Sequence, residues 1–239
     1  MRASRVAWAL VGVAGAVAVA TGAWSLLRAH EQERAYVELA EAASPAEAGE
    51  EAWEELDGQN PDAAAWLSVD GTSVDLPVCQ ASEDDPDWYL YHDLWGNSVD
   101  VGNPYLDWRC GPDSPTLCVL GHHTTLSDYM FHDLAGMFDQ GRFDSLGCAT
   151  WTTREGATEF SPLCSTKADR ADQTWRRFGW MPDANRAAWL REGCVAASAR
   201  SADWEGQCER ARRVLVLVTC SGWRRYGWGA RTITVFTAE

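Results

Sequence analysis

The sequence predicts a mainly β protein whose core is a closed or nearly closed barrel of about eight short strands. Short runs rich in Val, Leu, Thr and Trp alternate with turn residues, as in the hairpin turn Asp70-Gly71-Thr72. Many short strands favour a barrel because closure leaves no exposed strand edge. A single helix is expected at residues 184–200, inserted before the strand at 213–220, because apolar residues recur there at helical spacing. The expected strands are residues 66–69, 74–78, 104–108, 116–120, 148–152, 158–164, 213–220 and 231–237.

The residues before the barrel are expected to form a helical stalk. Residues 29–43 and the acidic stretch that runs on to Leu56 are rich in Glu and Ala, and Ser44-Pro45 separates the two helices. We therefore assign residues 28–57 to the stalk. The folded domain is expected to span residues 58–239, because a turn-rich segment follows the second helix.

The first residues of the chain have the pattern of a membrane anchor. Residues 6–27 are apolar or small almost throughout, and roughly 20 such residues cross a bilayer as a helix. Arg2 and Arg5 precede this stretch, so the positive-inside rule places residues 1–5 in the cytoplasm and the folded domain outside the cell membrane. The alternative is a cleaved signal peptide, although no clear Ala-x-Ala site ends the stretch.

Charge and cysteine spacing argue against two kinds of partner. The net charge of −15 argues against nucleic acid, since phosphate binding needs clustered Lys and Arg. The eight cysteines include no C-x-x-C pair and no Cys/His knuckle, so we do not expect a structural zinc site. A domain outside the membrane permits disulfides, and Cys110 with Cys118 and Cys194 with Cys208 are the locally plausible pairs. The spacing alone leaves their connectivity open.

Two of the expected strands end on side chains suited to thiol chemistry. Cys220 ends the run of alternating Val and Leu at 213–220, and a turn follows it. His122 and His123 follow the strand at 116–120 in the same way. A histidine near a cysteine can exchange a proton with it and later protonate a leaving amine. Neighbouring residues of an extended strand point to opposite faces, so only one of the two histidines can face the cysteine.

Each of these residues also has an ordinary structural interpretation. An isolated cysteine is most often a buried core residue, and a histidine pair is often a surface feature or a metal ligand. Arg231 begins the last expected strand, where it could supply a fixed cation to the thiol or to an oxyanion, or be a solvated strand-edge arginine. Arg224 and Arg225 lie nearer to Cys220 in sequence and compete with Arg231 for that role.

Several segments of the chain, taken in order, resemble those of class B sortases, which are cell-wall cysteine transpeptidases. The resemblance covers almost all of the chain after the expected anchor. One segment alone would carry little weight, but the common order makes the resemblance specific. The segments are Asn60-Pro61-Asp62, Trp66-Leu67, Gly71-Thr72, Asp75-Leu76-Pro77-Val78 with Gln80, Trp88-Tyr89-Leu90 with His92-Asp93, 102–107, Gly121-His122-His123, Ser127-Asp128-Tyr129-Met130-Phe131 with Leu134, Thr219-Cys220 and Ala230-Arg231.

The resemblance implies roles for three residues and a specific fold. It implies that Cys220 is the nucleophile, that His122, directly after the glycine, is the catalytic histidine, and that Arg231 positions substrate or stabilises the oxyanion. The implied fold is the sortase β-barrel of eight strands, with N-terminal helices and a helix in the connection before the nucleophile strand. The chain departs from the family in three respects. Its seven cysteines besides Cys220 are unusual and suggest one or two structural disulfides. The Cys220–Arg231 loop is longer and rich in Trp and Arg, and Val218 stands where serine is frequent.

The activity that the resemblance implies is that of a membrane-anchored transpeptidase without metal or organic cofactor. The enzyme would cleave a sorting motif near the C-terminus of a secreted protein and form a thioester on Cys220. It would then transfer the acyl group to an amine of the cell wall, carried by a peptidoglycan precursor. A pilus-polymerising sortase that uses a pilin lysine is the alternative within the family. An extracellular cysteine peptidase or amidase, and a non-catalytic binding module, are the alternatives outside it.

Overall fold

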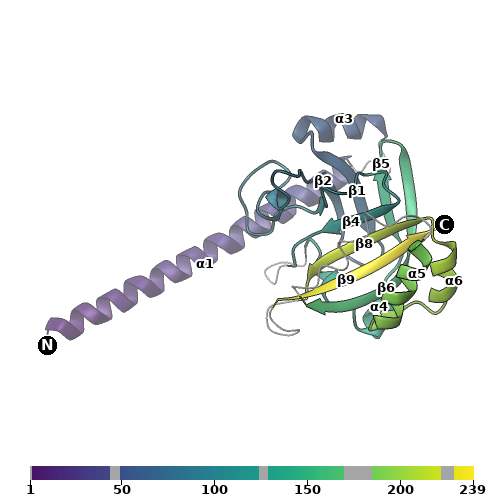
Figure 1. Cartoon of the computed structure of the whole chain (residues 1–239). Coiled ribbons are helices and arrows are strands. Elements are labelled where there is room, and N and C mark those ends of the chain that lie inside the picture. The colour runs from purple at the N-terminus through teal and green to yellow at the C-terminus, as the bar shows by residue number, and fades with distance from the viewer. Residues whose placement is uncertain (1, 44–48, 124–128, 170–184, 222–228) are drawn as a thin grey trace.

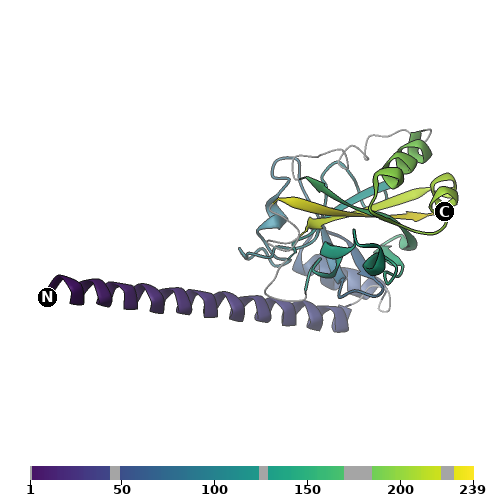
Figure 2. The same cartoon turned by 90° about the horizontal axis from the view of Figure 1, so that it is seen from below.

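The computed structural model describes residues 2–43, 49–123, 129–169, 185–221 and 229–239 (Figure 1). A long helix, α1 (Arg2–Ala43), projects from one side of a β-barrel. Figure 2 shows that the C-terminal part of this helix reaches the barrel, whereas its N-terminal part extends away from it. Over Val11–Glu41 the helix is long and apolar enough to cross a membrane. This criterion uses only length and composition, and a signal sequence also meets it.

The barrel is closed, as predicted. The strands are hydrogen-bonded in the order β5-β1-β2-β3-β4-β8-β9-β6-β7, and an additional pairing of β5 with β6 joins the first eight of these into a ring. β7 is a two-residue addition to β6. The strands are β1 (Ala63–Val69), β2 (Asp75–Gln80), β3 (Tyr105–Leu106), β4 (Thr116–Leu120), β5 (Ala149–Thr153), β6 (Gly156–Asp169), β7 (Ala199–Arg200), β8 (Arg213–Cys220) and β9 (Ala230–Ala238).

β4 and β8 match the sequence prediction residue for residue, whereas the other six expected strands differ from it at one or both ends. The strand expected at 104–108 is limited to two residues, because the chain turns at Asp107. The Asp107 carbonyl accepts the Cys110 N–H at 2.8 Å, and its carboxylate accepts the Arg109 Nε–H at 2.7 Å. β6 extends beyond the expected 158–164 in both directions, because β5 and β9 pair with it along most of its length.

The remaining helices surround the barrel. They are α3 (Glu50–Gln59), α4 (Gln140–Phe143), α5 (Arg186–Ala196) and α6 (Trp204–Arg210), with the 3₁₀ helices η1 (Trp88–Leu90) and η2 (Asp133–Gly136). The helix expected at 184–200 is α5, which ends earlier because Ala197 adopts an extended conformation and the chain then joins the sheet as β7. α6 was not predicted. It is seven residues long and buries one of them, Cys208, so it has too little periodicity to detect.

Part of the segment expected as a stalk packs against the barrel. One group of buried side chains fills the barrel, and a second lies between β1 and the helices α1 and α3. Tyr36 and Leu39 of α1 and Trp53 and Leu56 of α3 are buried in this second group together with Trp66 of β1. Burial of each of the larger apolar side chains contributes roughly 1.5–3 kcal/mol. The packed unit therefore begins within the helices, before the boundary expected at residue 58.

Candidate active site

β8 delivers Cys220 to one end of the barrel. Residues 214–218 of this strand are all buried, as expected for a strand with both faces covered. β8 lies between β4, which runs parallel to it, and β9, which runs antiparallel. The next residue, Ser221, is fully buried and donates its backbone N–H to the Ala230 carbonyl at 3.0 Å. Cys220 is therefore held at a fixed, half-buried position where the ladder ends.

Arg231 faces Cys220 across this ladder. The two residues form the last pair between β8 and β9, and opposed residues of an antiparallel pair project on the same side of the sheet. Nη1 of Arg231 donates a hydrogen bond to Sγ of Cys220 at 3.0 Å. The sulfur therefore has a charged N–H donor directly beside it.

β4 brings His122 to the same end of the barrel on the other side of β8. Leu120 of β4 is paired with Val218 of β8, and the Gly121 N–H continues the ladder by donating to the Val218 carbonyl at 3.0 Å. The same register carried forward sets His122 level with Cys220. The cysteine thus lies on the middle strand, with the histidine on one neighbouring strand and the arginine on the other.

A backbone carbonyl holds the His122 ring. Nε2 of His122 lies 2.9 Å from the carbonyl oxygen of Leu90. Since a carbonyl oxygen only accepts, Nε2 carries the proton, and Nδ1 of the neutral ring has the lone pair. Burial lowers the pKa of His122 below its ordinary 6.5. The charge of Arg231 also lowers it, while the Leu90 contact and Asp100 act in the opposite direction. The ring is therefore mainly neutral at neutral pH, and Nδ1 is the atom able to accept a proton.

His123 lies in a different environment. It pairs with Met130 in an isolated antiparallel bridge, and its ring centroid is 5.1 Å from that of His132. Burial lowers the pKa of His123, and the charges of His132 and His122 lower it further. His122 therefore contacts Leu90 and responds to Arg231, whereas His123 is next to Met130 and His132. The two histidines therefore have different neighbours, and which of them faces Cys220 stays a prediction.

Close packing of Phe131 explains the glycine before His122. A Cβ atom at Gly121 would lie 2.7 Å from the Phe131 ring, so no larger residue fits without a shift. Phe131 is fully buried, and its N–H donates to the His122 carbonyl at 3.0 Å. Met130, just before it, has a left-handed backbone with φ of 59°, a conformation uncommon for a bulky residue. These contacts fix the backbone that carries His122.

A buried hydroxyl pair supports the end of β8 behind Cys220. Thr232 Oγ1 donates to the Ala135 carbonyl of η2 at 2.6 Å, and Ser221 Oγ lies 3.1 Å from Thr232 Oγ1, to which it donates. Neither these hydroxyls nor the Leu90 carbonyl was predicted from the sequence. A backbone carbonyl has no sequence signature, and a serine after a strand is typical of any turn.

Some residues singled out from the sequence lie outside the described residues. Arg224 and Arg225, the competing cations, are among them, as are Ser127 and Asp128 of the histidine segment. In the part of the chain that the structure describes, no group of three or more His, Cys, Asp or Glu side chains is arranged to hold a metal ion. All eight cysteines, each of them described, are thiols.

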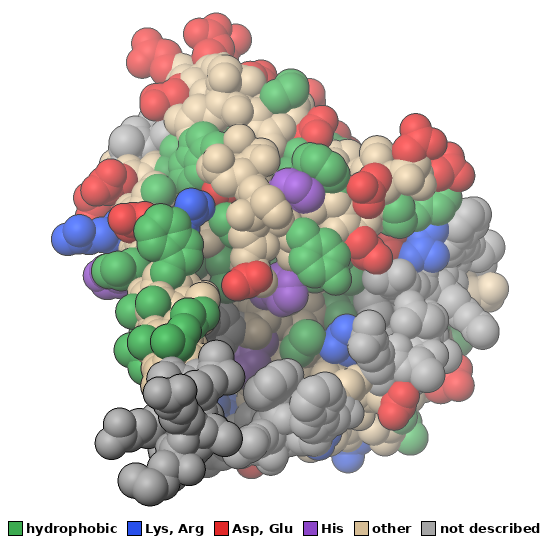
Figure 3. All heavy atoms as spheres, turned by 90° about the vertical axis from the view of Figure 1, so that its left-hand side faces the viewer, with side chains coloured by type: hydrophobic (Ala, Val, Ile, Leu, Met, Phe, Trp, Pro, Cys, Tyr) green, Lys and Arg blue, Asp and Glu red, His purple; other side chains and the backbone are tan. Residues whose placement is uncertain are grey.

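Figure 3 shows the molecule from the side on which β8 ends and β9 begins. Histidine side chains lie on this face among hydrophobic and acidic side chains. The exposed aromatic residues Trp88 and Tyr91 flank Leu90, and the Trp88 ring stacks on His92 with the centroids 3.6 Å apart. Exposed aromatic rings therefore lie next to Leu90, the residue that contacts His122.

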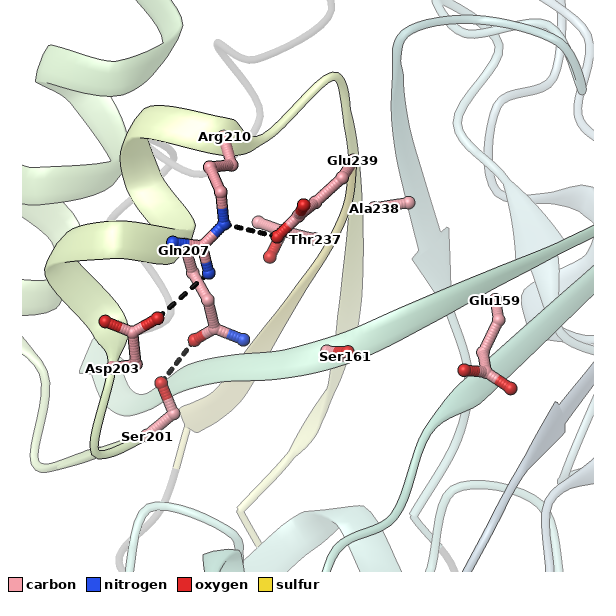
Figure 4. Close-up of a pocket in the computed structure, with 9 residues that line it drawn as sticks. All are labelled: Glu159, Ser161, Ser201, Asp203, Gln207, Arg210, Thr237, Ala238 and Glu239. Atoms are coloured by element: carbon pink, nitrogen blue, oxygen red, sulfur yellow. Dashed lines mark hydrogen bonds and ion pairs between the residues drawn. The ribbon is translucent and has the colours of Figure 1, made fainter.

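A polar pocket lies at the other end of the same two strands (Figure 4). Arg213 and Ala238 are the first pair of the β8–β9 ladder, at the end opposite to Cys220. In the pocket, Arg210 of α6 forms ion pairs with Glu239 and Asp203. These contacts fasten the C-terminus of the chain to α6, and the pocket is remote from the thiol.

Comparisons with known proteins identify the fold. The sequence matches no family model, and no curated protein matches it. Among solved structures, a mutant form of Clostridium perfringens sortase B superimposes with a TM-score of 0.75 at 22% identity, covering 87% of this chain and 98% of that one. The Staphylococcus aureus sortase B–substrate complex gives 0.71 at 20% identity, over 88% and 97%. Sortase B from Bacillus anthracis, in complex with AAEK1, gives 0.69 at 18% identity, over 89% and 99%.

These similarities extend over almost the whole of each sortase. At about 20% identity they define the fold rather than the activity. The chain has the fold of class B sortases, which is the fold predicted from its sequence.

Proposed function

We propose that the chain is a sortase-type cysteine transpeptidase. In this proposal Cys220 is the nucleophile, His122 accepts and returns a proton, and Arg231 stabilises negative charge on the reacting carbonyl oxygen. One observation carries the proposal: three adjacent strands bring these residues level at one end of the barrel, with Arg231 3.0 Å from the sulfur. The shared fold with class B sortases supports it.

In the first step, Cys220 attacks the carbonyl carbon of a substrate peptide bond. As the S–C bond forms, Nδ1 of His122 takes the thiol proton and the ring becomes an imidazolium. The carbonyl oxygen becomes negatively charged, and an N–H of Arg231 donates to it. The C–N bond then breaks, and His122 returns its proton to the departing amine. The product is a thioester on Cys220.

In the second step, an amine displaces the thiol. The amine nitrogen attacks the thioester carbonyl, and His122 takes one of its protons. The C–S bond breaks, and the Cys220 sulfur leaves with the bonding electrons and regains the proton from His122. A new amide bond results, with no net oxidation and no need for a cofactor. Water in place of the amine would give hydrolysis, so the outcome depends on which nucleophile reaches the thioester.

The charge arrangement supports this division of roles. Because burial and Arg231 keep His122 neutral, the ring is available as a base when the thiol is to be deprotonated. A guanidinium has five N–H donors, so Arg231 can keep one near the sulfur while another reaches the oxyanion. A lysine in the same place would offer a single point of charge.

We extend the proposal to topology and partners. Residues 6–27 form a single membrane anchor, and residues 1–5 lie in the cytoplasm. The catalytic domain, residues 58–239, lies outside the membrane, and the helices of residues 28–57 lead to it and pack in part against it. Substrates are secreted proteins with a C-terminal sorting motif, and the acceptor is an amine of a peptidoglycan precursor. A sortase B complex with substrate and another with triglycine support a peptide substrate and an amine acceptor. The exposed rings of Trp88 and Tyr91 provide an apolar surface for such a peptide.

The experiment uses the full-length chain in detergent, incubated with peptides that carry candidate sorting motifs. Mass spectrometry follows each peptide with and without a short amine acceptor such as triglycine. We expect cleavage and, with the amine, a ligated product. Cys220→Ala should give neither product. Cys148→Ala is the matched control, since Cys148 is the other cysteine that is not fully buried, and it should react as the wild type does.

The alternatives give different products in the same assay. Cleavage that never yields a ligated product, with any amine, would assign the chain to the peptidases. Ligation to a pilin lysine peptide in preference to cell-wall amines would assign it to pilus assembly. No covalent chemistry with any peptide, in a correctly folded preparation, would contradict the proposal.

A further inference from the structure

The Leu90 carbonyl that binds His122 lies in a largely irregular part of the chain. Residues 81–104 connect β2 to β3 and contain η1, which ends at Leu90. Within such a connection, tertiary contacts rather than a regular ladder decide where a carbonyl points. For Leu90 this contact comes from Gly102, which α1 in turn holds in place.

Gly102 lies directly against this carbonyl. Its φ of 57° is a conformation that glycine adopts without strain. A Cβ atom at position 102 would lie 2.7 Å from the Leu90 oxygen and 2.3 Å from the Tyr89 oxygen. The next residue, Asn103, donates its N–H to that Tyr89 oxygen at 2.9 Å. Any larger residue at 102 must therefore displace the carbonyl that His122 uses.

Two buried side chains of α1 hold Gly102 and its neighbours in place. Gln32 Nε2 donates to the Gly102 carbonyl at 3.2 Å, and Tyr36 Oη donates to Asn103 Oδ1 at 2.7 Å. Tyr36 Oη also accepts the backbone N–H of Leu94 at 2.9 Å. The helix thus binds this connection at two separate points. Because these groups are buried, losing one partner leaves the other unsatisfied.

We propose that Gly102 is a positioning residue for His122, and that Gln32 and Tyr36 of α1 hold it in that role. Through the Leu90 carbonyl, they keep the His122 proton on Nε2 and leave Nδ1 to accept the cysteine proton. The importance of this for catalysis rests on the proposed function, in which His122 is catalytic. The helix that leads from the expected membrane anchor would then take part in arranging the active site.

The test measures the His122 ring directly, in the full-length chain labelled with ¹⁵N-histidine. Long-range ¹H–¹⁵N spectra report which ring nitrogen carries the proton and at which pH the ring titrates. The variant is Gly102→Ala. Its matched control is Gly71→Ala, since Gly71 also has a positive φ, of 79°, and a Cβ there would lie 2.7 Å from a backbone oxygen, that of Ser145 in a different part of the barrel.

We expect wild-type His122 to show the Nε2–H tautomer and Gly102→Ala to show a mixture of tautomers. The acylation rate should fall about ten- to a hundredfold, because small misplacements of reacting groups cost this much. Gly71→Ala should leave the His122 signals and the rate unchanged even where it lowers the melting temperature. Tyr36→Phe adds no steric strain, so it covers the case in which Gly102→Ala does not fold, and it should shift the His122 signals in the same direction.

Two results would overturn the proposal: His122 signals unchanged in Gly102→Ala and Tyr36→Phe, or an equal shift in Gly71→Ala. The failure of the proposed function looks different. If the proposed function is wrong, His122→Ala would acylate at the wild-type rate. Gly102→Ala would nevertheless shift the NMR signals of the His122 ring.

A second and independent observation concerns three buried thiols. The sulfurs of Cys194 in α5 and Cys208 in α6 lie 3.9 Å apart. Both side chains are essentially inaccessible, and Cys164 of β6 lies near enough to Cys194 to raise the pKa of its thiol. The pair joins two helices that precede β8, so a disulfide there would constrain the unfolded chain and stabilise the packing of these helices.

We infer that Cys194 and Cys208 form a disulfide when the chain folds in an oxidising compartment. The two thiols react with a disulfide oxidant such as oxidised glutathione. One S–S bond forms between the cysteines, the S–S bond of the oxidant breaks, and two glutathione thiols leave with the two protons. Burial raises the pKa of Cys208 to about 12, so the bond should form before α5 and α6 pack rather than afterwards.

The test refolds the full-length chain in a glutathione redox buffer and maps its peptides without reduction. We expect a linked Cys194–Cys208 peptide and a melting temperature that falls on reduction, with Cys208→Ala removing both effects and Cys79→Ala removing neither. The acylation rate should not change. Eight alkylatable thiols after oxidative refolding, or a Cys164–Cys194 link instead, would overturn the inference.

Discussion

Nη1 of Arg231 donates a hydrogen bond to the Cys220 sulfur at 3.0 Å, across the last residue pair of the β8–β9 ladder. This contact is built into the sheet, because the register of two long strands decides which residues meet where they end. The parallel register of β4 and β8 does the same for His122. His122 lies about a hundred residues before Cys220, yet the register of these strands sets it level with Cys220 and Arg231.

Removing the Arg231 guanidinium should slow acylation with little loss of stability. A donor to a developing oxyanion is worth a factor of roughly a hundred to a thousand in rate. Arg231→Ala should therefore lower the single-turnover acylation rate by about that factor. Arg231→Lys should recover only part of it, because an ammonium lacks the planar, two-pronged geometry of the guanidinium.

The controls for this prediction are other arginines. Arg210→Ala breaks the ion pairs at the opposite end of the barrel and should acylate normally. Arg224→Ala and Arg225→Ala test the competing cations. If Arg231→Ala acylates at the wild-type rate while one of these is inactive, the cation has been assigned to the wrong residue.

The two neighbouring histidines should differ sharply in function. His122→Ala should abolish cleavage and transfer, because it removes the proton acceptor that we propose for Cys220. His123→Ala should retain most of the activity, since His123 lies beside Met130 and His132. Steady-state rates with one sorting peptide, at matched folding by circular dichroism, measure the difference. An inactive His123→Ala with an active His122→Ala would reverse the assignment.

The pKa values of the two histidines should respond to different neighbours. Burial disfavours the charged ring, so both should titrate below pH 6.5 in a Cys220→Ala background. Arg231→Met removes a positive charge near His122 and should raise the pKa of His122 while leaving His123 unchanged. His132→Gln should raise the pKa of His123 more than that of His122. NMR titration of the ring signals measures both, and an unshifted His122 in Arg231→Met would contradict the proximity of the two groups.

Gly121 should be needed for packing, whereas Gly193 should tolerate a larger side chain. Gly121→Ala drives a methyl group into the buried Phe131 ring and should cost about 1–3 kcal/mol of unfolding free energy. Gly193 of α5 has open space around its Cα, so Gly193→Ala should stabilise the chain by about 0.5–1 kcal/mol through helix propensity. Chemical denaturation at fixed pH gives both values, and equal effects would contradict the packing account.

The parts of the fold that were predicted from the sequence are those with a local signal. β4 and β8 are apolar runs with clear breakers, and both match residue for residue. α6 and the two-residue β7 have no periodicity to detect, and tertiary pairing forms them. β3 is short because Asp107 captures Arg109 and turns the chain, a side-chain contact that no strand pattern reports.

The same division applies to the candidate site. Cys220, His122 and Arg231 stand out because reactive side chains follow strand ends, and their catalytic roles remain predictions. Leu90 acts through its backbone carbonyl, and Gly102 through the absence of a side chain. Such contributions depend on which segments meet in space, so only the folded chain reveals them.

Mapping the acyl-enzyme tests the central claim most directly. The full-length chain is mixed with a sorting peptide, quenched in acid within one turnover, digested and analysed by mass spectrometry. We predict an adduct of the cleaved peptide on the fragment that contains Cys220, removed by hydroxylamine as a thioester is, and absent from Cys220→Ala. An adduct on any other cysteine, or peptide cleavage by Cys220→Ala, would contradict the account.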